Sequence, residues 1–233
     1  MTRVISARTF IDLMIAIAEK DGAKNEKYFR GTDKENRCLG AKMGNIFTLA
    51  KAFIDLPLQE INKLLDSEYY EVRMGAVSIM DFKARDKKTT EEAKKDLFSL
   101  YIKRHDRINN WDLVDRSAPY VVGGYLADKS RAILYKLATS KNVWERRTAI
   151  VSTYYFIRKN EIDDTFKIAE MLINDNHEYI HMAVGSWIRE AGKRDEQKLL
   201  NFLEKYAATM PRITLRYAVE KLSKELKSKY LAK

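Results

Sequence analysis

Apolar and polar residues follow a helical period along most of the chain. Between Ile5 and Lys20, the apolar residues Phe10, Met14, Ile17 and Ala18 recur at the spacing of an amphipathic helix. No stretch of any length alternates between apolar and polar residues as a half-buried strand would. Only three prolines and nine glycines occur, which suits nearly continuous helix with short connections. The pattern predicts an all-α protein.

Polar breaks divide this pattern into shorter helices. A helix is expected from about Lys42 to Ile54, and Pro57 suits the start of the next one. The most loop-like stretch is Arg30–Arg37, while Thr90 and Asn160 have the side chains and following acids of helix caps. Further breaks are expected near Ser67, Asp86, Asn109, Ser140, Asn176, Asp195 and Pro211.

A short pattern that ends in alanine recurs along the chain. It occurs as Val72–Ala76, Val114–Ala118, Glu145–Ala149, Tyr179–Ala183 and Thr214–Ala218. Self-similarity every 31 to 42 residues marks stacked helix pairs, in which each pair buries its apolar face against its neighbours. The expected fold is therefore one HEAT-like helical-repeat superhelix, an α-solenoid, that covers residues 1–233 as a single domain.

The charge of the chain changes the expected partner. Lysine and arginine total 43 against 33 aspartate and glutamate residues, which gives a formal net charge of +10. An excess of this size favours a polyanion, and the concave, basic face of a helical array is a natural cradle for a nucleic-acid backbone. A protein that is merely basic remains the alternative, because charge alone does not exclude it.

Several kinds of site are not indicated by the sequence. Cys38 is the only cysteine, so an internal disulfide is excluded and a reducing compartment is expected. The apolar run Met14–Ala18 is short for a signal peptide, and no run approaches the ~20 residues that cross a bilayer. With three histidines and no glycine-rich phosphate loop, neither a metal nor a cofactor is expected. We therefore expect a cytoplasmic, nucleoid-associated monomer with no membrane partner.

The stretch Asn109–Asp115 departs from the repeat. Asp115 stands where comparable helices carry Arg73 and Arg146, and it shares a helix face with Trp111. One interpretation is structural: an asparagine-capped helix start with a buried tryptophan and early acids that complement the helix dipole. The other is functional: an ionised carboxylate beside an aromatic wall, able to stabilise nearby positive charge.

The arginines and aromatic residues of the later repeats also allow both a structural and a functional interpretation. Arg146 is expected to form a structural salt bridge, because Arg73 takes the same position in an earlier repeat. That leaves Arg147 as the candidate for gripping a phosphate. Gly185 permits a close helix approach, and Trp187 is either core or part of a binding face.

Several of these motifs, in this order, resemble the DNA alkylation repair proteins of AlkD type. That family comprises HEAT-like-repeat DNA glycosylases that release N3- and N7-alkylated purines. The resemblance runs through most of the chain and is strongest from Asn110 to Leu222. Its elements are Trp111–Asp115, Val143–Ile150, Ala183–Gly185, Arg189–Asp195, Met210–Arg212 and Leu215–Ala218.

The resemblance implies a set of site residues. The catalytic aspartate falls on Asp115, its partner tryptophan on Trp111, and the arginine that holds DNA near the lesion on Arg147. The family's second tryptophan would stand at Ser186, whereas this chain has Trp187, about 100° further around the helix. The residues expected to contact DNA in addition are Trp187, Arg146, Lys42 and Arg189.

The resemblance also implies an activity. It is hydrolysis of the N-glycosidic bond of alkylated purines in double-stranded DNA, as a step of base excision repair. The transition state resembles an oxocarbenium ion that Asp115 stabilises, and neither metal nor cofactor is needed. The first alternative is a relative that has lost or changed catalysis and binds bent or branched DNA, for which Ser186 is the main reason. The second is a protein-interaction scaffold in which the basic charge is incidental.

Overall fold

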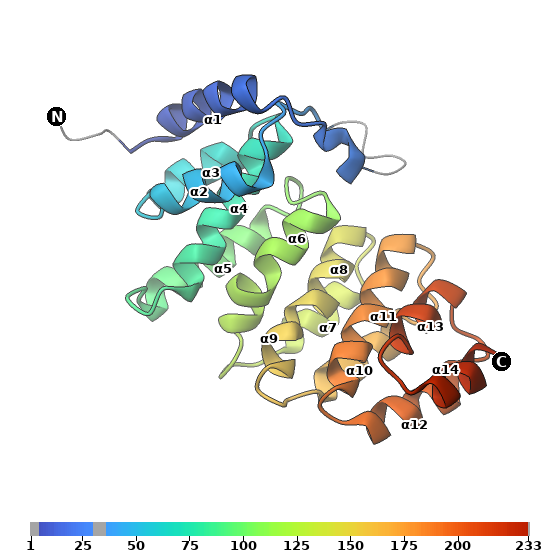
Figure 1. Cartoon of the computed structure of the whole chain (residues 1–233). Coiled ribbons are helices and arrows are strands. Elements are labelled where there is room, and N and C mark those ends of the chain that lie inside the picture. The colour runs from blue at the N-terminus through green and yellow to red at the C-terminus, as the bar shows by residue number, and fades with distance from the viewer. Residues whose placement is uncertain (1–4, 30–35, 233) are drawn as a thin grey trace. The chain divides into compact units, whose positions relative to one another are not determined.

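The computed structural model describes residues 5–29 and 36–232 and confirms the all-α expectation. These residues form helices joined by short connections, without a β-strand (Figure 1). The nearest feature to a sheet in the described chain is a single isolated bridge between Arg37 and Tyr69. The chain divides after Tyr125 into two compact units. The expectation of one domain stays a prediction, as does that of a concave basic face.

The first unit holds two helix pairs, a leading helix and the start of a third pair. Its elements are α1 (Ala7–Asp21), a 3₁₀ turn η1 (Asn25–Tyr28), α2 (Met43–Ala52), α3 (Leu58–Leu65), α4 (Tyr70–Arg85), α5 (Glu91–Lys103), α6 (Trp111–Ala118) and a π-helical segment η3 (Pro119–Gly124).

The second unit comprises residues 126–233 and is also helical. Its elements are α7 (Ala132–Ala138), α8 (Val143–Ser152), α9 (Tyr154–Ile157), α10 (Asp163–Leu172), α11 (Glu178–Gly192), α12 (Glu196–Tyr206), α13 (Arg212–Ala218) and α14 (Lys224–Leu231). No helix of the described chain is long and apolar enough to span a bilayer.

Helix α4 is the centre of the first unit. Every residue from Tyr70 to Asp81 is buried, because α1, α2, α3 and α6 all pack against this helix. Gly75 lets α1 come close: a Cβ there would lie 2.4 Å from the ring of Phe10. A helix surrounded in this way keeps its buried side chains in fixed positions, and several of them are polar groups that face α6.

Helix α11 takes the corresponding place in the second unit, where it packs against α8, α10, α12 and α13. The close approach expected at Gly185 is confirmed, since a Cβ there would lie 2.5 Å from the carbonyl oxygen of Thr214. Glycine therefore sets the spacing between α11 and α13.

The helix boundaries follow the sequence prediction in most places. Ser6 caps α1, Gly22 ends it in the left-handed conformation, and Thr90 caps α5 by accepting a hydrogen bond from the N–H of Ala93. The cap predicted at Asn160 is wrong. Asn160 has a φ of 62°, which closes a left-handed turn, and α10 begins only at Asp163. Most of the loop predicted at Arg30–Arg37 lies outside the described residues.

Candidate active site

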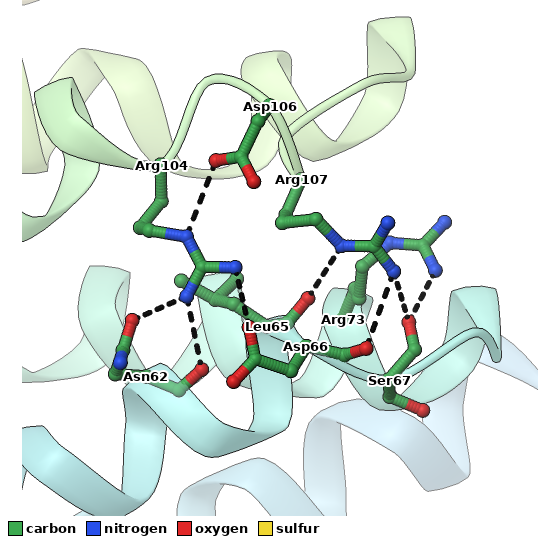
Figure 2. Close-up of polar contacts among 8 residues, drawn as sticks. All are labelled: Asn62, Leu65, Asp66, Ser67, Arg73, Arg104, Asp106 and Arg107. Carbon is green, nitrogen blue, oxygen red and sulfur yellow. Dashed lines mark hydrogen bonds and ion pairs between the residues drawn. The ribbon is translucent and has the colours of Figure 1, made fainter.

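Arginine side chains hold the turn that joins α3 to α4 (Figure 2). Arg73 donates to the carbonyl oxygens of Ser67 at 2.7 Å and Glu68 at 3.1 Å. Arg107 donates to Ser67 as well, at 2.8 Å, and to Leu65 at 3.0 Å. The last carbonyls of a helix have no partner within it and carry partial negative charge, so guanidinium groups satisfy them well.

Helix α8 repeats this arrangement. Arg146 donates to the carbonyl oxygens of Ser140 at 2.9 Å and Lys141 at 3.0 Å, at the same sequence spacings as in Arg73. Its other nitrogens form an ion pair with Asp175, with an Nε–Oδ2 distance of 2.5 Å and an Nη2–Oδ1 distance of 3.1 Å. The predicted structural salt bridge of Arg146 is confirmed, so any contact with DNA would have to compete with these bonds.

Asp115 takes the equivalent position on α6, where a carboxylate cannot donate to carbonyl groups. Two asparagines make polar contacts at the start of this helix. Asn110 caps it as predicted, with Oδ1 accepting a hydrogen bond of 2.8 Å from the N–H of Trp111. Asn109 accepts from Nη2 of Arg73 at 3.4 Å. The helix start is thus held by other groups, and position 115 can carry an acid.

Two buried polar contacts fix the rotation of α6 on α4. Near the start of α6, the hydroxyl of Tyr70 donates to Oδ2 of Asp112. One turn later, Arg116 forms an ion pair of 3.1 Å with Asp81, whose side chain is fully buried. Both contacts turn these side chains toward α4 and leave Asp115 partly exposed on another part of the helix surface.

The guanidinium group of Arg116 is also enclosed by aromatic rings. It lies 4.8 Å from the ring centre of Phe47 and 4.7 Å from that of Phe82. Burial raises the pKa of Asp81, while Arg116 and Arg85 act in the opposite direction. Arg116 is therefore part of the support beneath α6.

Trp111 and Asp115 are one helical turn apart on α6, and both side chains are partly exposed. This spacing places an indole and a carboxylate side by side on one helix, as the sequence predicted. The pair can offer an aromatic surface together with a negative charge to a group that approaches α6.

Asp112 has a different environment from Asp115. Its Oδ1 atom is buried and has no hydrogen-bond partner, whereas Oδ2 accepts from Tyr70. Burial raises the pKa of this carboxyl to about 7. Hydrogen bonds from Tyr70 and from the backbone N–H of Leu113 oppose that rise, and the charge of Asp115 adds to it. Burial and the neighbouring Asp112 also raise the pKa of the Tyr70 hydroxyl above its ordinary value. Sequence reasoning noted Asp112 but missed Tyr70.

The chain passes directly from α6 into the π-helical segment η3. Such wide turns are rare and occur often at functional sites. The ring of Tyr120 in this segment lies 3.8 Å from the guanidinium carbon of Arg85. Apart from Pro119 and the pair of glycines at its end, no sequence pattern indicates this segment.

The site residues expected in the second unit are placed less simply. Arg147 is only 6% exposed, and its Nη1 donates to the carbonyl oxygen of Tyr179 at 2.5 Å. Trp187 is partly exposed, and its ring lies 5.0 Å from that of Tyr154. Trp187 is therefore neither a fully buried core residue nor an isolated surface ring. Sequence reasoning missed Tyr154.

The remaining predicted DNA contacts differ in their availability. Arg189 forms ion pairs with Glu190, at 3.2 Å, and with Glu220. Lys42 directly precedes α2 and is 66% exposed, with its Nζ atom 3.9 Å from Asp21. Of these two cations, Lys42 is the one whose side chain is open to solvent.

Comparisons with known proteins identify the family. A family described as "DNA alkylation repair enzyme" matches residues 12–222. The chain belongs to this family. The resemblance inferred from Trp111–Asp115 and the later motifs is therefore confirmed.

A solved structure shares the fold of this family member. AlkD2 from Streptococcus mutans is 18% identical in sequence and superposes with a TM-score of 0.58, covering 94% of this chain and 100% of that one. This likeness supports the HEAT-like, all-α fold class. A comparison with curated protein sequences gave no match.

The family assignment leaves the individual site residues to be judged by their positions. The structure brings Trp111 and Asp115 together on one helix of the first unit, whereas Arg147 and Trp187 belong to the second. No group of three or more histidine, cysteine, aspartate or glutamate side chains suited to a metal ion occurs within the described residues.

Proposed function

We propose that this family member is a DNA glycosylase that hydrolyses the N-glycosidic bond of N3- and N7-alkylated purines in duplex DNA. The observation that carries the proposal is the position of Asp115. A carboxylate replaces an arginine that α4 and α8 use to hold the preceding turn, and it stands one helical turn from Trp111. The other charged side chains nearby on α6, Asp112 and Arg116, are turned toward α4.

This arrangement suits the chemistry of an alkylated purine. Such a base is already cationic and leaves readily, so positive charge develops on the deoxyribose as the bond breaks. A fixed carboxylate at Asp115 stabilises that charge and can orient the attacking water. Removing a preorganised group of this kind typically costs roughly 10²–10³-fold in rate. Trp111 would pack against the sugar.

The net charge of +10 supports attraction to the DNA backbone. In the second unit, Arg147 and Trp187 are the proposed DNA contacts, with Arg146 and Arg189 as further candidates. Lys42 is a further candidate in the first unit. Trp187 and Tyr154 together offer aromatic surface for a base or sugar. Arg147 would have to give up its bond to Tyr179 to reach a phosphate. In this proposed function, the protein acts as a monomer at the nucleoid, in base excision repair.

The test is release of 7-methylguanine from methylated duplex DNA. Asp115→Asn keeps the shape of the side chain and removes its charge, so release is expected to fall by roughly 10²–10³-fold. Asp128→Asn is the matched control, because that aspartate is 78% exposed and pairs with its neighbour Lys129. Equal release by the native chain and Asp115→Asn would refute the proposal.

A second function has one observation in its favour. Ser186 stands where the family resemblance places a tryptophan, and Arg147 is buried. A relative without catalysis would bind bent or branched DNA and leave 7-methylguanine in place. Absence of release from the native chain, together with salt-sensitive DNA binding, would select this function.

A further inference from the structure

Asp112 is a buried carboxyl group with an unequal pair of oxygens. Oδ2 accepts a hydrogen bond from Tyr70, and Oδ1 is buried without a partner. A buried ionised carboxylate ordinarily needs a cation or several donors to offset the loss of water. Tyr70, the backbone N–H groups of Leu113 and Asp112, and the dipole of α6 all favour the ionised form, but none of them is a cation.

The charged and titratable groups around Asp112 offer little more. The Tyr70 hydroxyl is neutral, and the thiol of Cys38, whose pKa burial raises to about 12, is neutral too. Arg73, the nearby cation on α4, directs its guanidinium group to Ser67 and other acceptors. Asp115, on the same helix, is a further acid and opposes a second negative charge.

We propose that Asp112 is a neutral carboxylic acid below neutral pH, that Tyr70 orients it, and that its ionisation is coupled to the charge of Asp115. Because Tyr70 donates to Oδ2, the proton of the acid belongs on Oδ1, the oxygen without a partner. Solvent supplies and removes this proton. Asp112 is thereby a positioning residue, because its hydrogen bond to Tyr70 holds α6 on α4. While Asp112 is neutral, Asp115 supplies the negative charge in the first two turns of α6.

One consequence rests on the proposed function. Ionisation of Asp112 above neutral pH would place a second negative charge near the DNA phosphates. At a separation of about 10 Å in water this weakens DNA binding by roughly two-fold, and it raises KM more than it changes kcat. Asp112→Asn should abolish that pH dependence of binding.

The proposal itself is tested by carbon-13 NMR of aspartate carboxyl groups in the full chain. One carboxyl signal should titrate near neutral pH and disappear in Asp112→Asn. Tyr70→Phe removes a hydrogen bond to the ionised form and should move that titration to higher pH. Asp115→Asn removes a neighbouring negative charge and should move it to lower pH.

A purely structural hydrogen bond between Tyr70 and Asp112 would not produce these opposite shifts of the Asp112 titration in Tyr70→Phe and Asp115→Asn. Asp81 is a second buried aspartate that can titrate above its usual range, and its signal should persist in Asp112→Asn. If no neutral-pH titration is lost in Asp112→Asn, the proposal is wrong. If that titration is lost in Asp112→Asn but does not move in Asp115→Asn, the proposed coupling between Asp112 and Asp115 is wrong. These results do not depend on base release, so failure of the glycosylase proposal would be seen separately.

Discussion

Helices α6 and α8 begin in the same way and then diverge. Asn110 accepts from the N–H of Trp111 at 2.8 Å, and Asn142 accepts from the N–H of Trp144 at 2.9 Å. Trp144 is buried, with 9% of its surface exposed, whereas Trp111 is more open to solvent. The repeat position three residues before the alanine is Arg146 on α8, where it bonds to two carbonyl oxygens and to Asp175. On α6 the same repeat position is Asp115.

The difference shows what a repeat requires before a structural position can change its charge. The arginine on α4 or α8 holds the turn before its own helix. On α6 this position is Asp115, and the rotation of the helix is fixed by the contacts of Asp112 and Arg116 with α4. Because those contacts hold α6, position 115 can carry a side chain suited to chemistry.

The largest effect is expected on the α8 side of the comparison. Arg146→Met removes the cation that pairs with Asp175, whose side chain is only 6% exposed, and leaves that carboxylate with the hydrogen bond from the N–H of His177 but without its ion pair. Breaking such a pair typically costs about 3–5 kcal/mol. Chemical denaturation of the variant should show this loss of unfolding free energy. Arg8→Met, at an 85% exposed arginine, should change it little, and similar values for the two variants would contradict the assignment.

A second variant restores the repeat residue on α6. Asp115→Arg should lower release of 7-methylguanine at least as much as Asp115→Asn, which is about 3–4 kcal/mol of barrier. The unfolding midpoint should change little, because position 115 is partly exposed. A kinetic assay and a thermal melt of the same preparation check both statements. Retained release would show that the charge at 115 is irrelevant.

Asp112 provides a stability test that does not involve DNA. Its pKa is raised from 3.8 to about 7 in the folded chain, so the folded state binds a proton more tightly than the unfolded state. Its contribution to stability is therefore intact at acid pH and is lost as the pH rises from about 4 to about 7. Relative to the native chain, Asp112→Asn should gain about 2.5 kcal/mol between pH 5 and pH 8.

Denaturant titrations of both proteins at the two pH values measure this difference. Asp96→Asn, at an aspartate on the rim of a cavity lined by Lys83 and Lys88, is the control for a loss of charge elsewhere in the first unit. A pH dependence that is the same in the native chain and Asp112→Asn would contradict the assignment.

The smallest expected effects come from the two tryptophans. Trp111→Phe should lower base release by about ten-fold, or 1.4 kcal/mol, while leaving stability nearly unchanged. Trp144→Phe should do the reverse and cost about 1–2 kcal/mol of stability, because a smaller ring leaves space in the core of the second unit. Equal effects on release from both variants would remove the distinction between α6 and α8.

The sequence predicted those features of the site that depend on neighbours in the chain. The cap at Asn110, the structural role of Arg146 and the close approach at Gly185 follow from local pattern and from comparison of repeats. The HEAT-like fold class follows from the repeat itself. Asn160 was misjudged because asparagine suits both a cap and a left-handed turn.

Other features depend on contacts between distant residues. Tyr70 and Asp112 are far apart in sequence, and only the packing of α6 on α4 brings them together. The burial of Arg147 was missed because adjacent residues on a helix differ by about 100° in direction, and the repeat pattern does not state which direction faces the core. The ring contact between Tyr154 and Trp187 likewise joins two repeats.

The environment of Cys38 has a practical consequence for labelling. It is the only cysteine of the chain, and its partly buried thiol has a pKa of about 12. Alkylating and maleimide reagents attack the thiolate, so this thiol should react very slowly near pH 7. A cysteine introduced at an exposed position such as Lys42 or Asp128 would then be modified selectively in the otherwise native sequence. A fluorophore attached there would report DNA docking without a cysteine-free background having to be engineered first.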